Sequence, residues 1–157
     1  MILKRGNLFD TKCRLIAHGV NCMGGFGSGV AGQIARLYPF VREEYLRKFK
    51  EDGWKLGDVQ FVDLLNGVDH EAYQWREFTT IANCATQFSY GRSGKHVNYA
   101  ALGVCLDKLM LYAKDNNVSL AIPKIGCGLG GGDWRDVSSI IEEREALYEI
   151  NLEVWEL

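Results

Sequence analysis

The sequence predicts an α/β fold in which helices cover both faces of one sheet. Short apolar runs typical of buried strands alternate along the chain with stretches of helical periodicity, which is the pattern of such a layered sheet. Two of these runs end in glycine-rich segments, at residues 21–31 and 123–134, and each segment leads into a helical pattern. Such a turn exposes backbone N–H groups at a helix N-terminus, where anions bind. We therefore expect a phosphate-bearing ligand between the two loops, at the carboxyl ends of the strands.

The first half of the chain contains the first alternating strands and helices. Residues 1–5 are predicted to form an edge strand, and residues 6–10 a turn. Residues 14–18 are mostly apolar, as expected for a parallel strand covered on both faces. A helix over residues 28–37 begins at the end of the first glycine loop. Pro39 starts a second helix, whose apolar residues fall at helical spacing: Phe40, Val41, Tyr45, Leu46 and Phe49.

The second half continues the pattern. Residues 57–65 and 78–85 are predicted strands, with a turn signal at Asn66-Gly67 between them. Residues 97–116 form the clearest amphipathic helix, which ends at Asn116-Asn117, and the expected buried stripe is Ala101, Val104, Cys105, Leu109 and Tyr112. Residues 118–123 are a buried strand. Asp133 can cap a helix that runs to about residue 147, and residues 150–157 are the last strand.

Composition narrows the class of protein. The 157 residues are enough for one domain with a proper core, which we expect to span residues 1–157. A net charge of −2 disfavours a direct nucleic-acid partner, because such proteins usually carry a basic excess. Five cysteines without a CxxC pair argue against disulfides or zinc and fit a reducing compartment. Since no apolar run approaches ~18 residues and no signal peptide is evident, we expect a cytoplasmic protein without a membrane partner.

The first glycine loop matches neither of the common phosphate-binding fingerprints. Gly24, Gly27 and Gly29 miss the G-x-G-x-x-G spacing of dinucleotide-binding folds, and no Gly-Lys-Ser/Thr sequence of a Walker loop occurs. The simplest alternative is a tight turn that needs glycine for positive φ, but one turn rarely needs four glycines in six residues. The second loop is denser still, with five glycines between residues 126 and 132. Its alternative reading is a flexible surface loop.

Five segments in order carry a family resemblance. They are residues 6–8 (Gly-Asn-Leu), 18–21, the first glycine loop with Val30-Ala31, residues 122–128 (Ile-Pro-Lys-Ile-Gly-Cys-Gly) and residues 154–157. Together the segments resemble the macrodomain family, the ADP-ribose-binding fold. The resemblance implies a three-layer α/β/α fold with a mixed, mostly parallel central sheet. Residues 21–29 and 35–39 most resemble the small yeast-and-phage type of ADP-ribose 1″-phosphate phosphatase.

The resemblance also implies roles for single residues. Asn7 and Leu8 would lie by the adenine, where most members have an acidic residue in place of Asn7. An amide oxygen can still accept from the adenine amine, but without charge, so weaker adenine binding is implied. Asn21 would contact the distal ribose. Backbone N–H groups of one loop would hold one phosphate (Gly27, Ser28, Gly29 and Val30), and the other loop would hold the second phosphate and the ribose (Ile125, Gly126, Cys127, Gly128, Leu129 and Gly130).

Catalysis needs separate residues. Release of a phosphate requires a nucleophile or activated water, charge neutralisation and a proton for the leaving group. No motif has a spacing that holds Mg²⁺, so we expect a reaction without metal or cofactor. His18 is the first candidate, as nucleophile or acid/base near neutral pH, and Asp133 is the second, with Asn21 beside them. Their structural alternatives are a strand-end histidine and an ordinary helix cap. Cys22 and Cys127 are expected to be small packing residues.

Three functions compete. The leading one is hydrolysis of ADP-ribose 1″-phosphate to ADP-ribose and phosphate. The second is a module that recognises free or protein-linked ADP-ribose without turnover, so ADP-ribosylated proteins are possible partners. The third is a glycohydrolase, since residues 125–129 and the helix after them also resemble the vertebrate terminal ADP-ribose protein glycohydrolase. That enzyme uses a lysine and an aspartate, whereas residues 81–86 here contain no lysine and Gly130 stands at the second position.

A basic segment precedes the long helix. Arg92, Lys95 and His96 lie within residues 89–96, which contain two further glycines and two serines. The segment could form a lid that brings positive charge to a terminal phosphate. The alternative is a solvated loop.

Overall fold

A six-stranded sheet forms the middle layer of the described part of the chain. The computed structural model describes residues 1–67 and 76–157. The strands follow the order β1-β6-β5-β2-β4-β3. All neighbours run parallel except β3 and β4, which confirms the mixed, mostly parallel sheet and the edge position of β1. The strands are β1 (Ile2–Arg5), β2 (Leu15–Val20), β3 (Val59–Asp63), β4 (Thr80–Ala85), β5 (Leu120–Pro123) and β6 (Glu153–Glu156).

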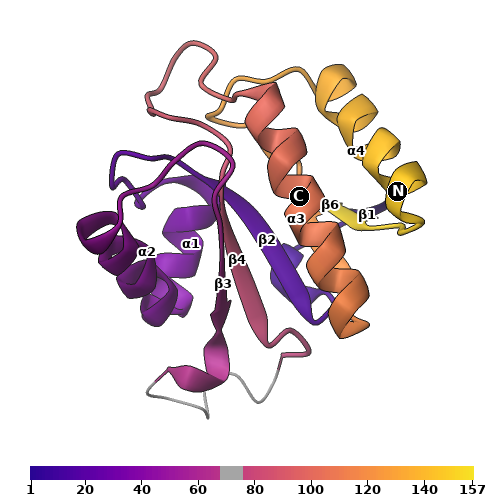
Figure 1. Ribbon diagram of the computed structural model, residues 1–157, viewed down its shortest axis with the longest axis horizontal. Helices are drawn as coiled ribbons and strands as arrows, with labels where there is room; N and C mark the ends of the chain where they lie inside the picture. Colours follow the sequence, from indigo (N-terminus) through magenta and orange to yellow (C-terminus); the bar gives the residue numbers. More distant parts are fainter. Residues whose placement is uncertain (68–75) are drawn as a thin grey trace.

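Helices cover both faces of this sheet, as predicted. Figure 1 shows α1 (Gly29–Leu37) and α2 (Pro39–Glu51) on one side, and α3 (Tyr99–Asn116) and α4 (Trp134–Tyr148) on the other. Two 3-10 turns, η1 (Leu8–Asp10) and η2 (Leu64–Asn66), follow β1 and β3. The described residues contain no helix that is both long and apolar enough to cross a membrane.

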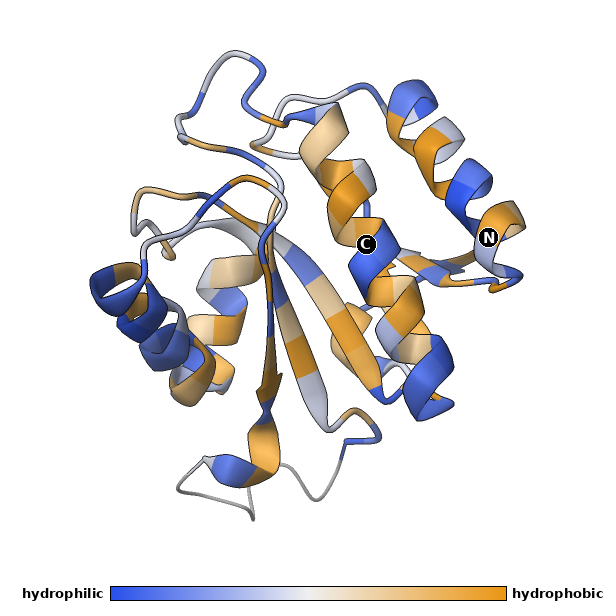
Figure 2. Ribbon diagram, viewed as in Figure 1, coloured by the Kyte–Doolittle hydropathy of each residue, from blue (hydrophilic) through white to orange (hydrophobic). Residues whose placement is uncertain are grey.

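Alternation along the strands divides the core into two apolar clusters. Ile16 and Ile81 face α1 and α2, where Tyr45 is fully buried with them. Leu15 and its neighbours on the opposite face pack with Leu106 of α3. Because successive side chains of a strand point to opposite faces, a strand covered on both sides is apolar throughout. Figure 2 shows orange and pale orange over much of β2 and β4, with blue and white bands between.

The predicted stripe on the long helix was partly wrong. Val104 is 43% exposed, whereas Leu102, Leu106 and Met110, which the stripe omitted, are fully buried. The helix α3 lies against both the sheet and α4, so it buries a wider face than a single stripe. The predicted helix ends are confirmed, since Asn117 closes α3 at φ 52° and the Asp133 side chain caps α4.

The C-terminal cap of α4 offers a stability test. Glu149 lies there at φ 56°, in the left-handed region where a side chain costs roughly 1 kcal/mol that glycine avoids. We expect Glu149→Gly to raise the free energy of unfolding by up to about 1 kcal/mol, measured by urea denaturation. Glu149→Ala is the control, because it removes the same charge and keeps the Cβ. An equal gain in both variants would show that the charge, not the backbone, sets the cost.

Candidate functional site

Two adjoining cavities form one groove at the loops that follow β1, β2 and β5. The loop cavity, of about 640 Å³, is lined by residues 18–21, 25–31, 86–87, 90–92, 123–126 and 128–130. The edge cavity, of about 370 Å³, is lined by residues 6–8, Val30, Gln33, residues 123–124, 127–128 and 155–157. Val30, Pro123, Lys124 and Gly128 line both. All thirteen residues predicted to bind the ligand line one cavity or the other.

The N-terminus of α1 opens into the loop cavity. The Gly32 N–H donates to the Ser28 carbonyl (3.1 Å), which is the first bond of the helix. The N–H groups of Gly29, Val30 and Ala31 therefore precede the helical ladder, and all three residues line the cavity. The helix dipole adds partial positive charge at this point. These features suit an anion, and phosphate binding at this end of the groove stays a prediction.

Asn21 holds the first glycine loop in shape. Its amide nitrogen donates to the Gly25 carbonyl (2.7 Å), and its amide oxygen accepts from the N–H groups of Met23 (2.9 Å) and Gly25 (3.1 Å). The Tyr45 hydroxyl also donates to the Asn21 carbonyl (2.7 Å). Most of the amide's hydrogen-bonding capacity is thus used within the loop. Contact of Asn21 with the distal ribose and a part in catalysis stay predictions.

The glycines of the second loop are needed chiefly for close packing. A Cβ on Gly130 would lie 2.7 Å from the Gly126 carbonyl oxygen, and one on Gly131 would collide with the Gly94 carbonyl. The Gly132 N–H donates to that same Gly126 oxygen (2.8 Å). Only Gly128 in this loop has open space at its Cβ position. The loop therefore folds tightly upon itself and leaves one glycine exposed toward both cavities.

The basic segment lies against both glycine loops. The His96 N–H donates to the Gly130 carbonyl (2.7 Å). The Tyr90 ring lies so near Gly25 that a Cβ there would be 2.7 Å from it. Arg92 lines the loop cavity, whereas the Lys95 ammonium lies 4.1 Å above the Tyr99 ring. The segment thus borders the groove with Tyr90 and Arg92, and closure as a lid stays a prediction.

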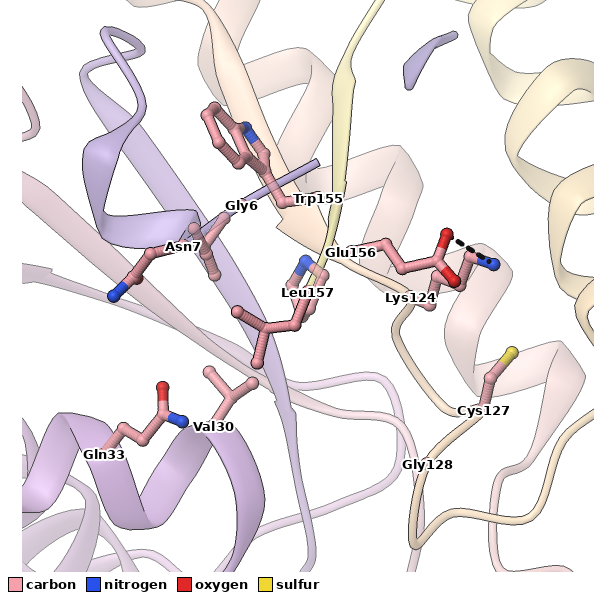
Figure 3. A pocket seen from close by; sticks show the side chains of 12 residues that line it. Gly6, Asn7, Val30, Gln33, Lys124, Cys127, Gly128, Trp155, Glu156 and Leu157 are labelled. Atoms are coloured by element: carbon pink, nitrogen blue, oxygen red, sulfur yellow. Dashed lines mark ion pairs between the residues drawn. The ribbon is translucent and has the colours of Figure 1, made fainter. Parts of the chain in front are cut away.

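Asn7 lines the edge cavity, and Figure 3 shows its amide nitrogen at the free end of the side chain. Its oxygen accepts from the Phe9 N–H (2.9 Å), which fixes the orientation of the amide because only the oxygen can accept. The oxygen has a second lone pair, so it can cap η1 and still accept from the adenine amine, and that contact stays a prediction. Trp155, which the sequence reasoning missed, lines the same cavity and lies against Gly6. The Lys124–Glu156 ion pair (3.1 Å) lies beside them.

His18 is enclosed beneath the loop cavity. Its side chain is 1% exposed, its ring meets Phe26 edge-on at 5.5 Å, and Nε2 lies 2.5 Å from the Asn83 amide oxygen. Burial lowers the pKa of His18 to about 4, against the opposing effect of the Asn83 hydrogen bond. A ring with this lowered pKa is neutral at pH 7. A catalytic role as a neutral ring stays a prediction.

The lowered pKa of His18 predicts an acid-sensitive fold. The unfolded ring takes up a proton near its usual pKa of 6.5, and the folded ring only near 4. Protons therefore favour the unfolded state in this window, and stability is lost as pH falls from 6.5 toward 4. Between about pH 7 and pH 5 we expect wild type to lose about 2 kcal/mol more than His18→Gln in urea denaturation. Equal losses would contradict a buried, neutral ring.

Asp133 lies outside both cavities. Its carboxylate caps α4 by accepting from the Arg135 N–H (2.8 Å) and pairs with the Arg135 guanidinium (3.0 Å). Hydrogen bonds from Arg135 lower the pKa of Asp133. The alternative reading as a helix cap is confirmed, while its role as an acid/base stays a prediction with no place in the lining of the groove.

The two loop cysteines are free and at least partly buried. Burial raises the pKa of Cys22 and of Cys127. Cys22 packs in the core cluster beneath α1 and α2, and Cys127 lines the edge cavity. Among residues 1–67 and 76–157, no three His, Cys, Asp or Glu side chains gather as a metal site would require.

Some lining residues were not predicted. Gln33 follows Val30 by three positions on α1, so helical spacing could have placed it on the same face. Tyr90 and Thr86 come to the loop cavity from the segment after β4. Trp155 reaches the edge cavity from β6. No local sequence pattern predicts that Thr86, Tyr90 and Trp155 line the groove, because the order of the strands in the sheet brings them there.

Comparison with known proteins agrees with this geometry. A family model of the Macro domain matches residues 17–141. A 17.5 kDa protein of Enterobacteria phage T4 is 31% identical over 144 residues, which cover 90% of this chain and 86% of that protein. The DNA ADP-ribosyl glycohydrolase of Mycobacterium tuberculosis is 30% identical over 134 residues, 84% of this chain but only 35% of that protein. The ADP-ribose 1″-phosphate phosphatase of Saccharomyces cerevisiae is 25% identical over 167 residues, with 88% and 89% covered.

Solved structures share the fold over almost the whole chain. A protein from Bacteroides thetaiotaomicron superimposes with a TM-score of 0.82 at 26% identity, covering 99% of this chain and 97% of its own. The macrodomain of Thermus aquaticus DarG does so with a TM-score of 0.79 at 25% identity, with the same shares covered. Because the family model matches residues 17–141, which is most of the sequence, this chain belongs to the macrodomain family of ADP-ribose-binding domains.

Proposed function

We propose that this chain binds ADP-ribose 1″-phosphate in the groove and hydrolyses it to ADP-ribose and inorganic phosphate. The observation that carries the proposal is the continuous groove between the N-terminus of α1 and the second loop. A diphosphate at Gly29 and Val30 would receive free backbone N–H groups and the helix dipole. The full-length similarity to the yeast phosphatase supports this choice of substrate.

The two ends of the ligand take different cavities in this proposal. The adenine lies in the edge cavity beside Asn7, Leu8 and Trp155, where apolar walls favour a flat base. The distal ribose and its phosphate extend into the loop cavity toward His18 and Arg92. The Arg92 guanidinium is suited to neutralise charge on the terminal phosphate. His18 and Asn21 are the proposed catalytic residues, and Asp133 is retained only as a candidate to be tested.

A glycohydrolase is the second candidate. The DNA ADP-ribosyl glycohydrolase of M. tuberculosis is more similar in sequence than the yeast phosphatase, although this chain spans about a third of it. Such a reaction would cleave the bond at C1″ of ADP-ribose attached to DNA or protein, and would need the same two loops. The formal net charge of −2 favours a small ligand over DNA.

One experiment separates these functions. The purified chain is mixed with ADP-ribose 1″-phosphate and followed by phosphorus NMR. We expect an inorganic phosphate signal to grow with ADP-ribose as co-product. Broadening of the diphosphate signals without product would contradict the phosphatase and leave a binding module. A parallel assay with ADP-ribosylated DNA and protein tests for released ADP-ribose, the product of a glycohydrolase.

Asn7→Asp tests the base end of the groove. The carboxylate keeps one oxygen on the Phe9 N–H and offers a second to the adenine amine, where the wild type has an N–H donor. We expect ADP-ribose to bind about tenfold more tightly, or about 1.4 kcal/mol, in isothermal titration calorimetry. Inosine diphosphate ribose is the control, because its base presents an oxygen there and gains nothing. An equal gain for both ligands would place the base elsewhere.

A further inference from the structure

Three side chains on neighbouring strands form a hydrogen-bonded relay that ends at His18. The register pairs Gln60 of β3 with Asn83 of β4, and Asn83 with His18 of β2. Gln60 Nε2 donates to the Glu44 carbonyl of α2 (2.9 Å). Asn83 Nδ2 donates to Gln60 Oε1 (3.0 Å), and Asn83 Oδ1 lies 2.5 Å from His18 Nε2.

The relay has only one consistent assignment of donors and acceptors. A backbone carbonyl can only accept, so the Gln60 nitrogen must face Glu44 and the Gln60 oxygen must face Asn83. That oxygen requires a donor, so the Asn83 nitrogen faces it and the Asn83 oxygen faces the imidazole. His18 Nε2 must then carry the hydrogen. In a neutral ring, Nδ1 is left as a bare acceptor.

Within the described residues, Nδ1 of His18 is a buried acceptor without a partner, and His18 is one of the residues that line the loop cavity. The Phe26 ring, edge-on at 87°, fixes the plane of the imidazole. A buried acceptor without a donor is unfavourable, so an O–H group that reaches it gains by donating to it.

We propose that His18 serves the loop cavity as a fixed acceptor, through Nδ1, for an O–H group, and that Asn83 and Gln60 are the positioning residues that hold it so. The O–H group belongs either to a hydroxyl of the distal ribose or to a water molecule. An ionised phosphate oxygen carries no hydrogen and faces the Nδ1 lone pair unfavourably. In this proposal the terminal phosphate therefore binds to the loop N–H groups and Arg92, and not to Nδ1. The tautomer and orientation of His18 do not depend on the proposed function. Only the identification of the O–H group as a ribose hydroxyl rests on it.

Nitrogen NMR of the imidazole rings tests the assignment directly. Long-range ¹H–¹⁵N spectra at neutral pH distinguish the two tautomers, and His18→Gln identifies the His18 signals among the three histidines. We expect one neutral tautomer with hydrogen on Nε2. A ring protonated on Nδ1, a charged ring or an average of tautomers would overturn the proposal, whatever ligand the protein binds.

Variants at the positioning residues test the relay. Gln60→Leu does not touch the ring but removes the acceptor that orients Asn83, so we expect the single tautomer to be lost. Asn83→Asp is the matched control, since a carboxylate needs no orientation and keeps hydrogen on Nε2. If Gln60→Leu leaves the tautomer unchanged, the relay does not set it. If that variant fails to fold, the wild-type spectrum still decides the tautomer and Asn83→Leu tests the relay.

Addition of ADP-ribose identifies the O–H group. A change of the Nδ1 shift on binding assigns the group to the ribose, whereas a shielded Nδ1 that is the same with and without ligand assigns it to water. An Nδ1 without a hydrogen bond in both states would overturn the proposal. Failure of ADP-ribose to bind in calorimetry would count against the proposed function and not against the tautomer.

Discussion

Gly29→Glu is expected to weaken ADP-ribose binding at least ~100-fold, or about 2.7 kcal/mol. The Gly29 Cβ position has no atom within 4 Å, so the side chain enters open space at the N-terminus of α1. There the carboxylate occupies the place proposed for a phosphate and is itself favoured by the helix dipole. The phosphate of the ligand is then repelled by the carboxylate, which also occupies the N–H groups that would bind it. The dissociation constant is measured by isothermal titration calorimetry.

Gly53→Glu is the matched control for this variant. Gly29 has φ +58° and Gly53 has φ +78°, both have open space at Cβ, and Gly53 lies after α2, away from both cavities. Each variant therefore adds the same charge and roughly 1 kcal/mol of left-handed strain. We expect similar losses of stability in urea but normal binding for Gly53→Glu. Equal losses of affinity would contradict a phosphate site at Gly29.

The sequence predicted the layered fold because burial on both faces makes the strands nearly pure apolar runs. Residues 15–17 and 81–82 are such runs, and both lie at the centre of the sheet. The order of the strands in the sheet could not be predicted, because no local sequence pattern shows that β6 lies between β1 and β5. The error on α3 has the same origin. Periodicity shows that one face is buried, but it cannot show that α4 covers a second face around Leu102.

In the candidate site too, local features could be predicted from the sequence and long-range contacts could not. Glycine loops after strands are local signals, and they led to the N-terminus of α1 and to Gly128. Side-chain roles depend on partners distant in sequence. Asn83, 65 residues from His18, makes the imidazole a buried hydrogen-bond donor, and the Phe9 N–H donates to the oxygen of Asn7. The sequence could nominate His18 and Asn7 but could not show which of their atoms face the groove.

His18→Ala is expected to lower phosphate release from ADP-ribose 1″-phosphate at least ~100-fold, the usual scale for a group that handles a proton. Its ring has a buried nitrogen without a partner in the described part of the chain, and His18 lines the loop cavity. Because Nδ1 has no hydrogen to give, its contribution is acceptance of an O–H hydrogen bond. The ligand's phosphates lie on the loops in this proposal, so ADP-ribose affinity should stay within about twofold. Initial rates and calorimetry separate the two effects.

His96→Ala is the matched control, because it removes a second imidazole whose side chain lines neither cavity. Loss of the Asn83 hydrogen bond and the Phe26 contact also lowers the stability of His18→Ala, so rates are compared well below its unfolding temperature. Asp133→Asn tests the rival candidate, since an amide caps a helix as well as a carboxylate but cannot exchange a proton. A normal rate for His18→Ala with a large loss for Asp133→Asn would move the chemistry to the start of α4. Normal rates for both variants would show that neither residue is catalytic. His18, Asn83 and Gln60 would then have only a structural role beneath the loop cavity.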